Sequence, residues 1–589
     1  MKKPMILSMT ALSILSLLCS CNPTPNPTYI AKQLPVYGYS MEKLEDANCR
    51  YYDEYPNIPF MDINSYTKYL LNKETTISKV SKDVYLINTF KGSATIDVKN
   101  DVLHSDDYNE FINTTIYRDE TAHNVYYDGS KFIKPSTRNV EDEVTAKTIN
   151  FKDYKIDFIY DDGKLWAPFI TYSDMFKGVT MIQGFCDGKN IYFSDSNKLD
   201  MTQCYLTWNY YINFADVYYK NGVRDPKTAE HTYYELCFSI DNYFGYPGRS
   251  PIEELMKEHG LDYALQNYSD STRITREYLL STSVAKYVAG MIFLGNLLDD
   301  GGHTVINQGV DWLCYTKVMG ESFTSEVQRL IIRSGYEEIP STSYDGRSIF
   351  RPARENSEIQ NQVFYSKGDT FIYSFDQFDI NFDQWDAFYA GETDELPNDT
   401  VGNFHRGIRM AQENPAIKNF VLDISINGGG FGDVVVYLMG AMANAPYICY
   451  YDFIDQRNVK QDYLCDINLD GKFDELDNQK IADFNFAILT SGISFSCGNL
   501  LPADAKDNEI PLLGGKTGGG ACAVLDNCTM EGVYYRTSSF VQLSNANFEN
   551  IDQGIDVDYD LTVKDGEFNI DNFYNVDLIS SYINEFYSL

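Results

Sequence analysis

The sequence predicts an α/β catalytic domain preceded by a mostly β amino-terminal region. Two segments carry this prediction: residues 419–432, NFVLDISINGGGFG, and residues 486–520, which begin FAILTSGISFSCGNLL. Each starts with an apolar run short enough for a buried strand and continues through a glycine-rich or serine-rich turn into a helical pattern. A chain of 589 residues exceeds one ordinary hydrophobic core, so we expect two or more domains.

The amino terminus predicts export and lipidation. Lys2 and Lys3 precede an apolar stretch, residues 6–18, that is too short to cross a bilayer as a stable helix. The stretch ends in Leu-Cys-Ser-Cys, the pattern of a lipoprotein signal peptide in which residues 1–20 are removed and Cys21 carries lipid. Residues 21–36 begin with a proline-rich tether. We therefore expect a lipid-anchored protein of the bacterial cell envelope, on the periplasmic or cell-surface side; a plain secretory signal is the alternative.

Charge argues against nucleic acid as a partner. The chain has 48 Lys and Arg against 84 Asp and Glu, a formal net charge of −36, and no basic stripe. An acidic excess of this kind is typical of exported proteins.

The elements follow in three regions. Residues 37–225 are rich in Tyr, Phe, Ile and Val with polar alternation and Asp-Gly turns, which predicts strands of a region without a catalytic motif. Residues 226–340 predict helices: one from Pro251 after a serine cap, one over residues 274–298, and one over residues 309–334. Residues 341–589 alternate, with a strand at 370–375, a helix at 400–413, a strand from 419 that leads into the Asn-Gly-Gly-Gly turn, a helix at 434–443, and then the strand that leads to the serines.

Two serines in the segment Gly-Ile-Ser-Phe-Ser-Cys-Gly-Asn, residues 492–499, compete for the role of nucleophile. Together with the Asn-Gly-Gly-Gly strand end, this segment resembles the serine peptidases of the tail-specific (C-terminal processing) protease family. The Phe-Ser-x-Gly pattern is similar to the tricorn-like branch and selects Ser496 over Ser494. The resemblance implies a ClpP/crotonase-like β-α-β sheet with a helical subdomain, and an oxyanion hole from backbone N–H groups of Cys497 and of Gly429 or Gly430. A purely capping role for the serines is the alternative.

The general base departs from the main family pattern. The family lysine belongs to a Gly-Glu-x-Thr-x-Gly-Lys segment, but Gly520 stands in its place here and Lys516 comes four residues earlier. The tricorn-like branch implies a histidine instead, and His303 lies in Asp-Asp-Gly-Gly-His-Thr, similar to that branch's Asp-Gly-His-Thr motif. His405 is the second choice among six histidines. Asp552, in Asp-Gln-Gly-Ile-Asp-Val-Asp, is a candidate for the orienting carboxylate. A standard PDZ module is not expected between His303 and Lys367.

A separate loop lies inside the catalytic region, in an expected insertion over residues 451–482. Its spacing resembles an EF-hand or dockerin calcium loop, with glycine at position six and ligands expected from Asp466, Asn468, Asp470, Lys472 (through its carbonyl), Asp474 and Asp477. We expect a structural Ca²⁺ there and no cofactor for catalysis; an acidic surface turn is the alternative. The cysteines show no zinc pattern, and Cys522 and Cys528 are close enough in sequence for a disulfide or remain free thiols.

The predicted function is therefore a membrane-anchored serine endopeptidase that hydrolyses exported polypeptides with Ser496 and His303. The alternative is a catalytically silent relative that binds peptides or glycans, because the family lysine is missing.

Overall fold

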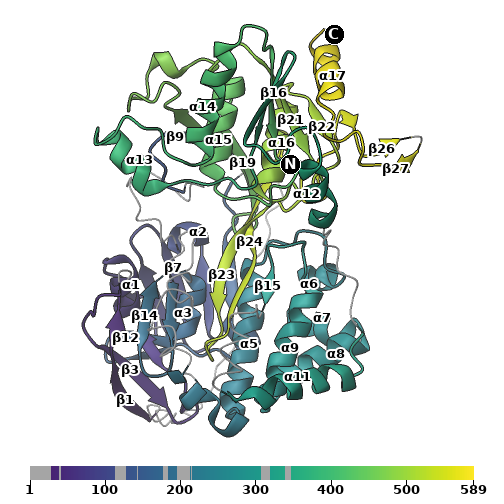
Figure 1. Ribbon diagram of the computed structural model, residues 1–589. Helices are drawn as coiled ribbons and strands as arrows, with labels where there is room; N and C mark the ends of the chain where they lie inside the picture. The colour runs from purple at the N-terminus through teal and green to yellow at the C-terminus, as the bar shows by residue number, and fades with distance from the viewer. Residues whose placement is uncertain are drawn as a thin grey trace, which may run out of the picture.

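The computed structural model describes residues 28–38, 41–112, 128–141, 143–176, 183–194, 212–213, 215–306, 319–337, 346–564 and 566–588. The predicted signal peptide, the predicted lipidation site Cys21 and the first ten residues of the helix expected over residues 309–334 lie outside the described residues. The chain forms two lobes (Figure 1). The amino-terminal sheets and helices α5 to α11 make the lower lobe, and the serine-bearing sheet makes the upper lobe.

The amino-terminal region is mostly β, as predicted. Its strands form sheets of order β1-β3-β4-β12-β11, β10-β8-β7-β6-β5 and β13-β14-β2. The strands are β1 (Tyr29–Leu34), β2 (Val36–Tyr37), β3 (Ala47–Tyr52), β4 (Phe60–Asp62), β5 (Thr76–Lys79), β6 (Val84–Asn88), β7 (Ser93–Asp97), β8 (Val102–Ser105), β10 (Lys147–Asn150), β11 (Ile159–Asp161), β12 (Lys164–Pro168), β13 (Gln183–Cys186) and β14 (Ile191–Ser194). Short helices connect them: α1 (Ile63–Leu71), α2 (Tyr108–Phe111), η1 (Phe151–Tyr154) and α3 (Phe169–Met175).

The helical part of the lower lobe follows η3 (Lys220–Gly222) and contains α5 (Pro226–Tyr243), α6 (Glu253–His259), α7 (Leu261–Asn267), α8 (Asp270–Leu279), α9 (Val284–Leu297) and α11 (Glu321–Arg333). The single helix expected over residues 274–298 is wrong. Two helices replace it, because Ser283 caps a new N-terminus by accepting a hydrogen bond from the Lys286 N–H. The helix expected from Pro251 begins at Glu253.

The upper lobe is built around a six-stranded sheet of order β16-β17-β18-β21-β22-β25. All neighbours are parallel except β16 and β17. Its strands are β16 (Phe364–Lys367), β17 (Thr370–Ser374), β18 (Asn419–Asp423), β21 (Asn485–Thr490), β22 (Leu512–Gly514) and β25 (Tyr559–Asp560), and its helices are α12 (Arg347–Glu355), α13 (Phe382–Tyr389), α14 (Thr400–Glu413), α15 (Gly432–Ala443), α16 (Cys497–Asp507) and α17 (Val576–Ser588). The alternating strands and helices predicted between residues 370 and 443 are present. A hairpin of β26 (Val563–Lys564) and β27 (Glu567–Phe568) projects from this lobe (Figure 1).

A further sheet, of order β15-β24-β19-β20-β9, joins the lobes. It consists of β9 (Ile133–Val140), β15 (Val305–Ile306), β19 (Tyr447–Asp452), β20 (Arg457–Cys465) and β24 (Tyr534–Ser544), with β23 (Cys522–Cys528) paired to β24. Strand β9 comes from the amino-terminal region and pairs with β20, inside the segment expected to be an insertion. The amino-terminal region and the serine-bearing region, which are separate in the sequence, therefore share one sheet.

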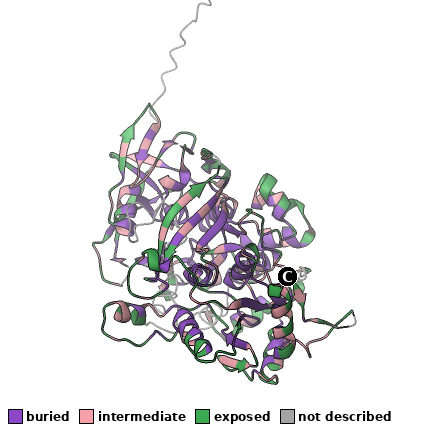
Figure 2. Cartoon of the chain, turned by 90° about the horizontal axis from the view of Figure 1, so that it is seen from above, coloured by how far each residue is buried: buried purple, intermediate pink, exposed green. Residues whose placement is uncertain are grey.

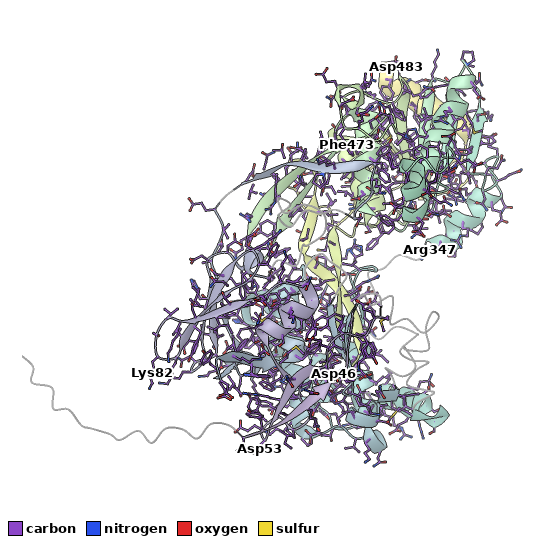
Figure 3. The ribbon with its side chains drawn as sticks, turned by 90° about the vertical axis from the view of Figure 1, so that its left-hand side faces the viewer. Asp46, Asp53, Lys82, Arg347, Phe473 and Asp483 are labelled. Carbon is purple, nitrogen blue, oxygen red and sulfur yellow. The ribbon has the colours of Figure 1, made fainter. Side chains whose placement is uncertain are left out.

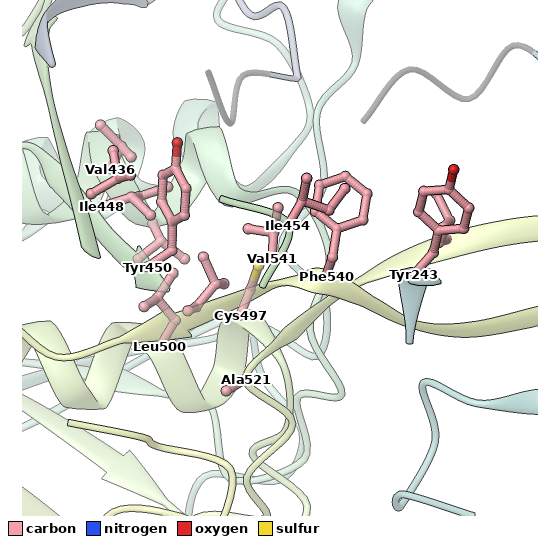
Figure 4. Close-up of a cluster of buried hydrophobic side chains, with 14 of the residues drawn as sticks. Tyr243, Val436, Ile448, Tyr450, Ile454, Cys497, Leu500, Ala521, Phe540 and Val541 are labelled. Atoms are coloured by element: carbon pink, nitrogen blue, oxygen red, sulfur yellow. The ribbon is translucent and has the colours of Figure 1, made fainter. Parts of the chain in front are cut away.

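The core is continuous across the junction. Figure 4 shows Tyr243 of α5 beside Phe540 of β24, and then Tyr450 of β19 and Leu500 of α16, in one apolar cluster. Figure 2 shows the central strands and helices largely buried and the exposed residues at the periphery. Cys522 and Cys528 are free, because the strand β23 holds them at its opposite ends. Within the described residues, no helix is both long and apolar enough to cross a bilayer.

Candidate active site

A cleft of about 1070 Å³ lies where the two lobes meet. The lower lobe contributes residues 248–249, residues 301–303 and Arg536 of β24, while the upper lobe contributes residues 428 and 430, residues 492–496 and residues 515–518. Figure 3 shows Arg347, another lining residue, at the edge of the upper lobe that faces the lower lobe. The two motifs singled out in the sequence, around Ser496 and around His303, thus meet in one cleft.

Ser496 occupies a sharp turn between strand β21 and helix α16. Its backbone has a positive φ, with φ 59° and ψ −121°, a conformation that costs a non-glycine residue about 1–3 kcal/mol and recurs at functional sites. The Ser496 N–H donates to the Gly519 carbonyl at 2.9 Å, which ties the turn to the glycine-rich segment. The side chain faces the cleft, at the N-terminus of α16.

The competing serine is committed to the fold. Ser494 is fully buried; its hydroxyl donates to the Ile424 carbonyl at 2.8 Å and accepts from the Ser491 N–H at 3.0 Å. Ser494 therefore holds the turn together, and Ser496 alone of the pair is available to a substrate.

Two backbone N–H groups beside Ser496 are suited to bind an oxyanion. In the described part of the chain, neither the Gly430 N–H nor the Cys497 N–H donates to a backbone carbonyl, and the Cys497 thiol donates to the Gly430 carbonyl at 3.1 Å. The Gly429 N–H is different, because it donates to the Asn427 side-chain oxygen at 2.8 Å. Of the two alternatives predicted, the geometry therefore favours Gly430 as the partner of Cys497.

Glycine is required at position 429 for a steric reason. Its φ is 113°, and a Cβ atom there would lie 2.7 Å from the Cβ and 3.1 Å from the hydroxyl of Ser496. The Asn-Gly-Gly-Gly turn thus lets the backbone approach the nucleophile closely.

His303 sits in a turn held by Asp300. One carboxylate oxygen of Asp300 accepts from the N–H groups of His303 (2.9 Å) and Thr304 (2.8 Å), and the other accepts from the Thr304 hydroxyl. The His303 carbonyl accepts from the Arg536 guanidinium at 3.0 Å. The imidazole packs edge-to-face on Phe495, with ring centroids 4.8 Å apart. Burial lowers the pKa of His303 to about 4, so the ring is neutral at physiological pH and able to accept a proton.

The predicted orienting carboxylate has other partners. Asp552 accepts from the Ala521 N–H at 2.6 Å and from the Gln542 side chain at 2.8 Å, and no hydrogen bond joins it to His303 within the described residues. Burial raises the pKa of Asp552 to about 6. The Nδ1 atom of His303 is buried without a hydrogen-bond partner. Among the residues described, no hydrogen bond joins His303 to Ser496 either, so both roles remain predictions.

The second-choice histidine does not face the cleft. His405 is buried, its Nε2 lies 2.6 Å from the Tyr437 hydroxyl, and burial lowers its pKa to about 3. It acts as a core residue.

Phe495 gives a physical reason for the missing lysine. Gly520 has φ 82°, and a Cβ atom there would lie 2.4 Å from the Phe495 ring. Any side chain at position 520 therefore collides with the ring that supports His303. Lys516 lies on the cleft but is 51% exposed, and its ammonium group forms a 3.3 Å ion pair with Asp556.

The predicted calcium loop turns back on itself through its own carboxylates. Asp466 accepts from the N–H groups of Asp470 and Gly471, and Asp477 accepts from those of Ile467, Asn468 and Asp474. In the described part of the chain, no three His, Cys, Asp or Glu side chains surround a common metal position. The loop is separate from the cleft, and its calcium remains a prediction.

The sequence analysis missed several lining residues. Phe495 stands inside the quoted motif, but nothing in the pattern revealed that its ring would carry the histidine. Arg249, Arg347 and Arg536 also line the cleft. They are far apart in sequence and belong to no motif, so only the fold brings them together.

Comparison with known families supports a peptidase. Residues 380–561, less than half of the chain, match the family model described as peptidase family S41. This segment is similar to a peptidase S41 domain. It contains Ser496, Gly430 and Cys497, whereas His303 lies outside it. The match supports a hydrolase whose substrates are polypeptides. No match was found among curated proteins.

Solved structures show only distant likeness. A structure from Parabacteroides merdae, described provisionally as a peptidase, is 13% identical, with a TM-score of 0.36 over 61% of this chain and 96% of its own. A lipoprotein from Streptococcus agalactiae is 11% identical, with a TM-score of 0.34 over 61% and 96%. Mature CPAF in complex with lactacystin is 11% identical, with a TM-score of 0.34 over 61% and 97%.

Proposed function

We propose that the S41 domain is the catalytic part of a serine endopeptidase with Ser496 as nucleophile and His303 as general base. The observation that carries this proposal is the placement of Ser496: a strained turn at a helix N-terminus, open to a cleft, beside two N–H groups that donate to no backbone carbonyl. A serine hydroxyl needs such an arrangement together with a base to attack a peptide bond.

Each residue has a definite part in the proposed reaction. Neutral His303 takes the proton of the Ser496 hydroxyl as the serine oxygen attacks the scissile carbonyl carbon. The N–H groups of Cys497 and Gly430 stabilise the negative charge that develops on the carbonyl oxygen. The imidazolium then gives its proton to the leaving amine, which breaks the peptide bond and leaves an acyl-serine. Water hydrolyses the acyl-serine and releases the acid, with His303 again accepting a proton.

Labelling with a fluorophosphonate probe tests this assignment. We expect the wild-type chain to be labelled at Ser496 and the Ser496→Ala variant to be unlabelled, with peptide hydrolysis lost by about a million-fold and an unchanged melting temperature. The matched control is Ser494→Ala, whose hydroxyl does not face the cleft; it should keep labelling and lose some stability. Equal hydrolysis by the wild type and by Ser496→Ala would refute the peptidase assignment.

A catalytically silent protein that binds peptides or glycans is the second candidate. Two observations favour it: Gly520 replaces the family lysine, and His303 and Ser496 are not hydrogen-bonded within the described residues. It predicts an intact cleft that binds ligand and is never labelled by the probe.

We further propose that the chain is lipid-anchored at Cys21 in the bacterial cell envelope and cleaves exported polypeptides, on the sequence pattern of its first residues. The loop at residues 466–477 is proposed to bind a structural Ca²⁺, on its EF-hand spacing and its glycine at φ 81°.

A further inference from the structure

The cleft is positively charged in a strongly acidic protein. The chain carries a formal net charge of −36, yet among the described residues no Asp or Glu lines the cleft, whereas Arg249, Arg347, Arg536 and Lys516 do. A protein with a large negative net charge repels acidic peptides overall, so a cleft lined by cationic side chains is the place where an acidic group of a ligand can bind.

The three arginines form no direct contact with a carboxylate, although Arg249 lies within electrostatic range of Asp552. Within the described chain none of them takes part in an ion pair. Arg249 donates to the carbonyls of Gly518 (2.6 Å) and Asp552 (2.5 Å), and Arg536 donates to those of Gly302 and His303. These hydrogen bonds tie the two guanidinium groups to the walls of the cleft. Lys516, in contrast, is paired with Asp556.

Arg347 is the arginine whose guanidinium is free for a ligand. It is the first residue of α12, it is exposed, and it makes no hydrogen bond or ion pair within the described residues. A Cβ atom built on Gly428 would lie 3.1 Å from its Nη2 atom. The guanidinium therefore lies over the Asn-Gly-Gly-Gly turn, whose next residue, Gly429, directly adjoins Ser496.

We propose that Arg347 is a specificity-determining residue that binds a carboxylate of the peptide substrate close to the scissile bond. A guanidinium matches a carboxylate in a bidentate fork, and the positive charges of Arg249 and Arg536 in the same cleft strengthen the attraction. The carboxylate comes either from an Asp or Glu side chain or from the C-terminus of the substrate. This inference rests on the proposed function, because it names the substrate class of the same cleft.

Paired internally quenched peptides test the inference. A positional library identifies a cleaved sequence, which is then made with Glu or Gln at each position and with a free or an amidated C-terminus. In the wild type, we expect one carboxylate to raise kcat/KM at least tenfold over its uncharged partner, mainly through KM, since a charge-assisted hydrogen bond changes affinity by about ten- to a hundredfold. Preference for Glu over Gln identifies a side-chain carboxylate, and preference for the free end identifies a terminal one.

Variants of helix α12 separate this effect from general charge. Arg347→Gln should reduce the preference to less than about threefold, and Arg347→Lys should restore part of it. The matched control is Arg351→Gln, which removes an exposed arginine on the same helix that does not line the cleft and should leave the preference intact. A wild type indifferent to the carboxylate, or a preference that survives Arg347→Gln, would overturn the inference.

Binding to the inactive variant separates this inference from the peptidase assignment. Fluorescence anisotropy with Ser496→Ala and Ser496→Ala/Arg347→Gln measures affinity for the same labelled peptides without turnover. If no peptide is hydrolysed but the charged peptide binds at least tenfold more tightly in an Arg347-dependent way, the inference holds and the peptidase assignment fails. If peptides are hydrolysed at Ser496 but the charged and uncharged peptides behave alike, the peptidase assignment holds and the inference about Arg347 fails.

Discussion

Adding one methyl group at Gly520 tests why the family lysine is absent. The Gly520→Ala variant must keep φ at 82°, which costs an L-residue about 1–2 kcal/mol. It must also displace the Phe495 ring, three of whose atoms would lie 2.4–2.8 Å from the new Cβ. Moving that ring also disturbs the imidazole of His303, which packs on it with ring centroids 4.8 Å apart.

The second cost adds to the first. Losing the edge-to-face contact between Phe495 and His303 forfeits about 0.5–1.5 kcal/mol. We therefore expect Gly520→Ala to lower the free energy of unfolding by about 2–3 kcal/mol and to slow fluorophosphonate labelling, because the imidazole loses its support. Gly520→Lys should label no faster than Gly520→Ala, since the lysine cannot enter the site.

Urea unfolding with linear extrapolation measures the free energy of unfolding of each variant, and the rate of fluorophosphonate labelling measures the reactivity of Ser496. The matched control is Gly391→Ala, at φ 71° with no atom within 4 Å of the added Cβ, which should lose only the backbone share of about 1–2 kcal/mol and label normally. If Gly520→Ala loses no more than Gly391→Ala and labels at the wild-type rate, the steric explanation is refuted.

Two more predictions concern the base and the calcium loop. Because burial lowers the pKa of His303 to about 4, the imidazole stays neutral, and able to act as a base, down to mildly acidic pH. In a pH–rate profile, kcat/KM should therefore stay level from pH 8 down to about pH 5 and fall at lower pH. A profile in which kcat/KM falls to half its maximum near pH 6.5 would contradict the assignment. For the loop, an ion that binds only the folded state stabilises it by RT ln(1 + [L]/Kd), so a chelator should lower the melting temperature and excess Ca²⁺ should restore it. The Asp470→Ala variant should lose this response. The control variant Asp483→Ala, which removes an exposed carboxylate outside the loop, should keep it. If neither Ca²⁺ nor chelator changes the melting temperature of the wild type, the loop is an acidic surface turn and not a calcium site.

Local patterns predicted the upper lobe well. The helix over residues 400–413 and the strands at 370 and 419 appear where expected, because each is a short apolar run bounded by a cap or a turn. The choice of Ser496 over Ser494 depended on a motif, and the fold gives its reason: Ser494 uses its hydroxyl inside the turn. Chemistry that belongs to one continuous segment is visible in the sequence.

Long-range pairing was not predictable in the same way. Strands β9 and β20 are more than 300 residues apart, and neither shows its partner in its own residues. The break between α8 and α9 was missed because the apolar spacing continues through it, while the capping role of Ser283 depends on the turn the chain takes there. The charged cleft was missed for the same reason: its arginines come from three separate segments.

Strand β24 explains how the base and the nucleophile come to share one cleft. Its Arg536 donates to the His303 carbonyl, and its Ser538 donates to the Asp300 side chain at 2.7 Å, so the strand carries the whole histidine turn. Further along, Gln542 donates to Asp552, and the strand pairs with β19 of the upper lobe.

Because β24 runs as one strand of 11 residues from the lower lobe into the upper (Figure 1), it fixes the turn relative to the serine sheet without a hinge between them. A catalytic pair drawn from distant segments needs such rigid support to keep its geometry. The arrangement therefore places Asp552 as part of the frame that holds β23 and β24 together, while Phe495, which contacts the imidazole directly, sets the position of the ring.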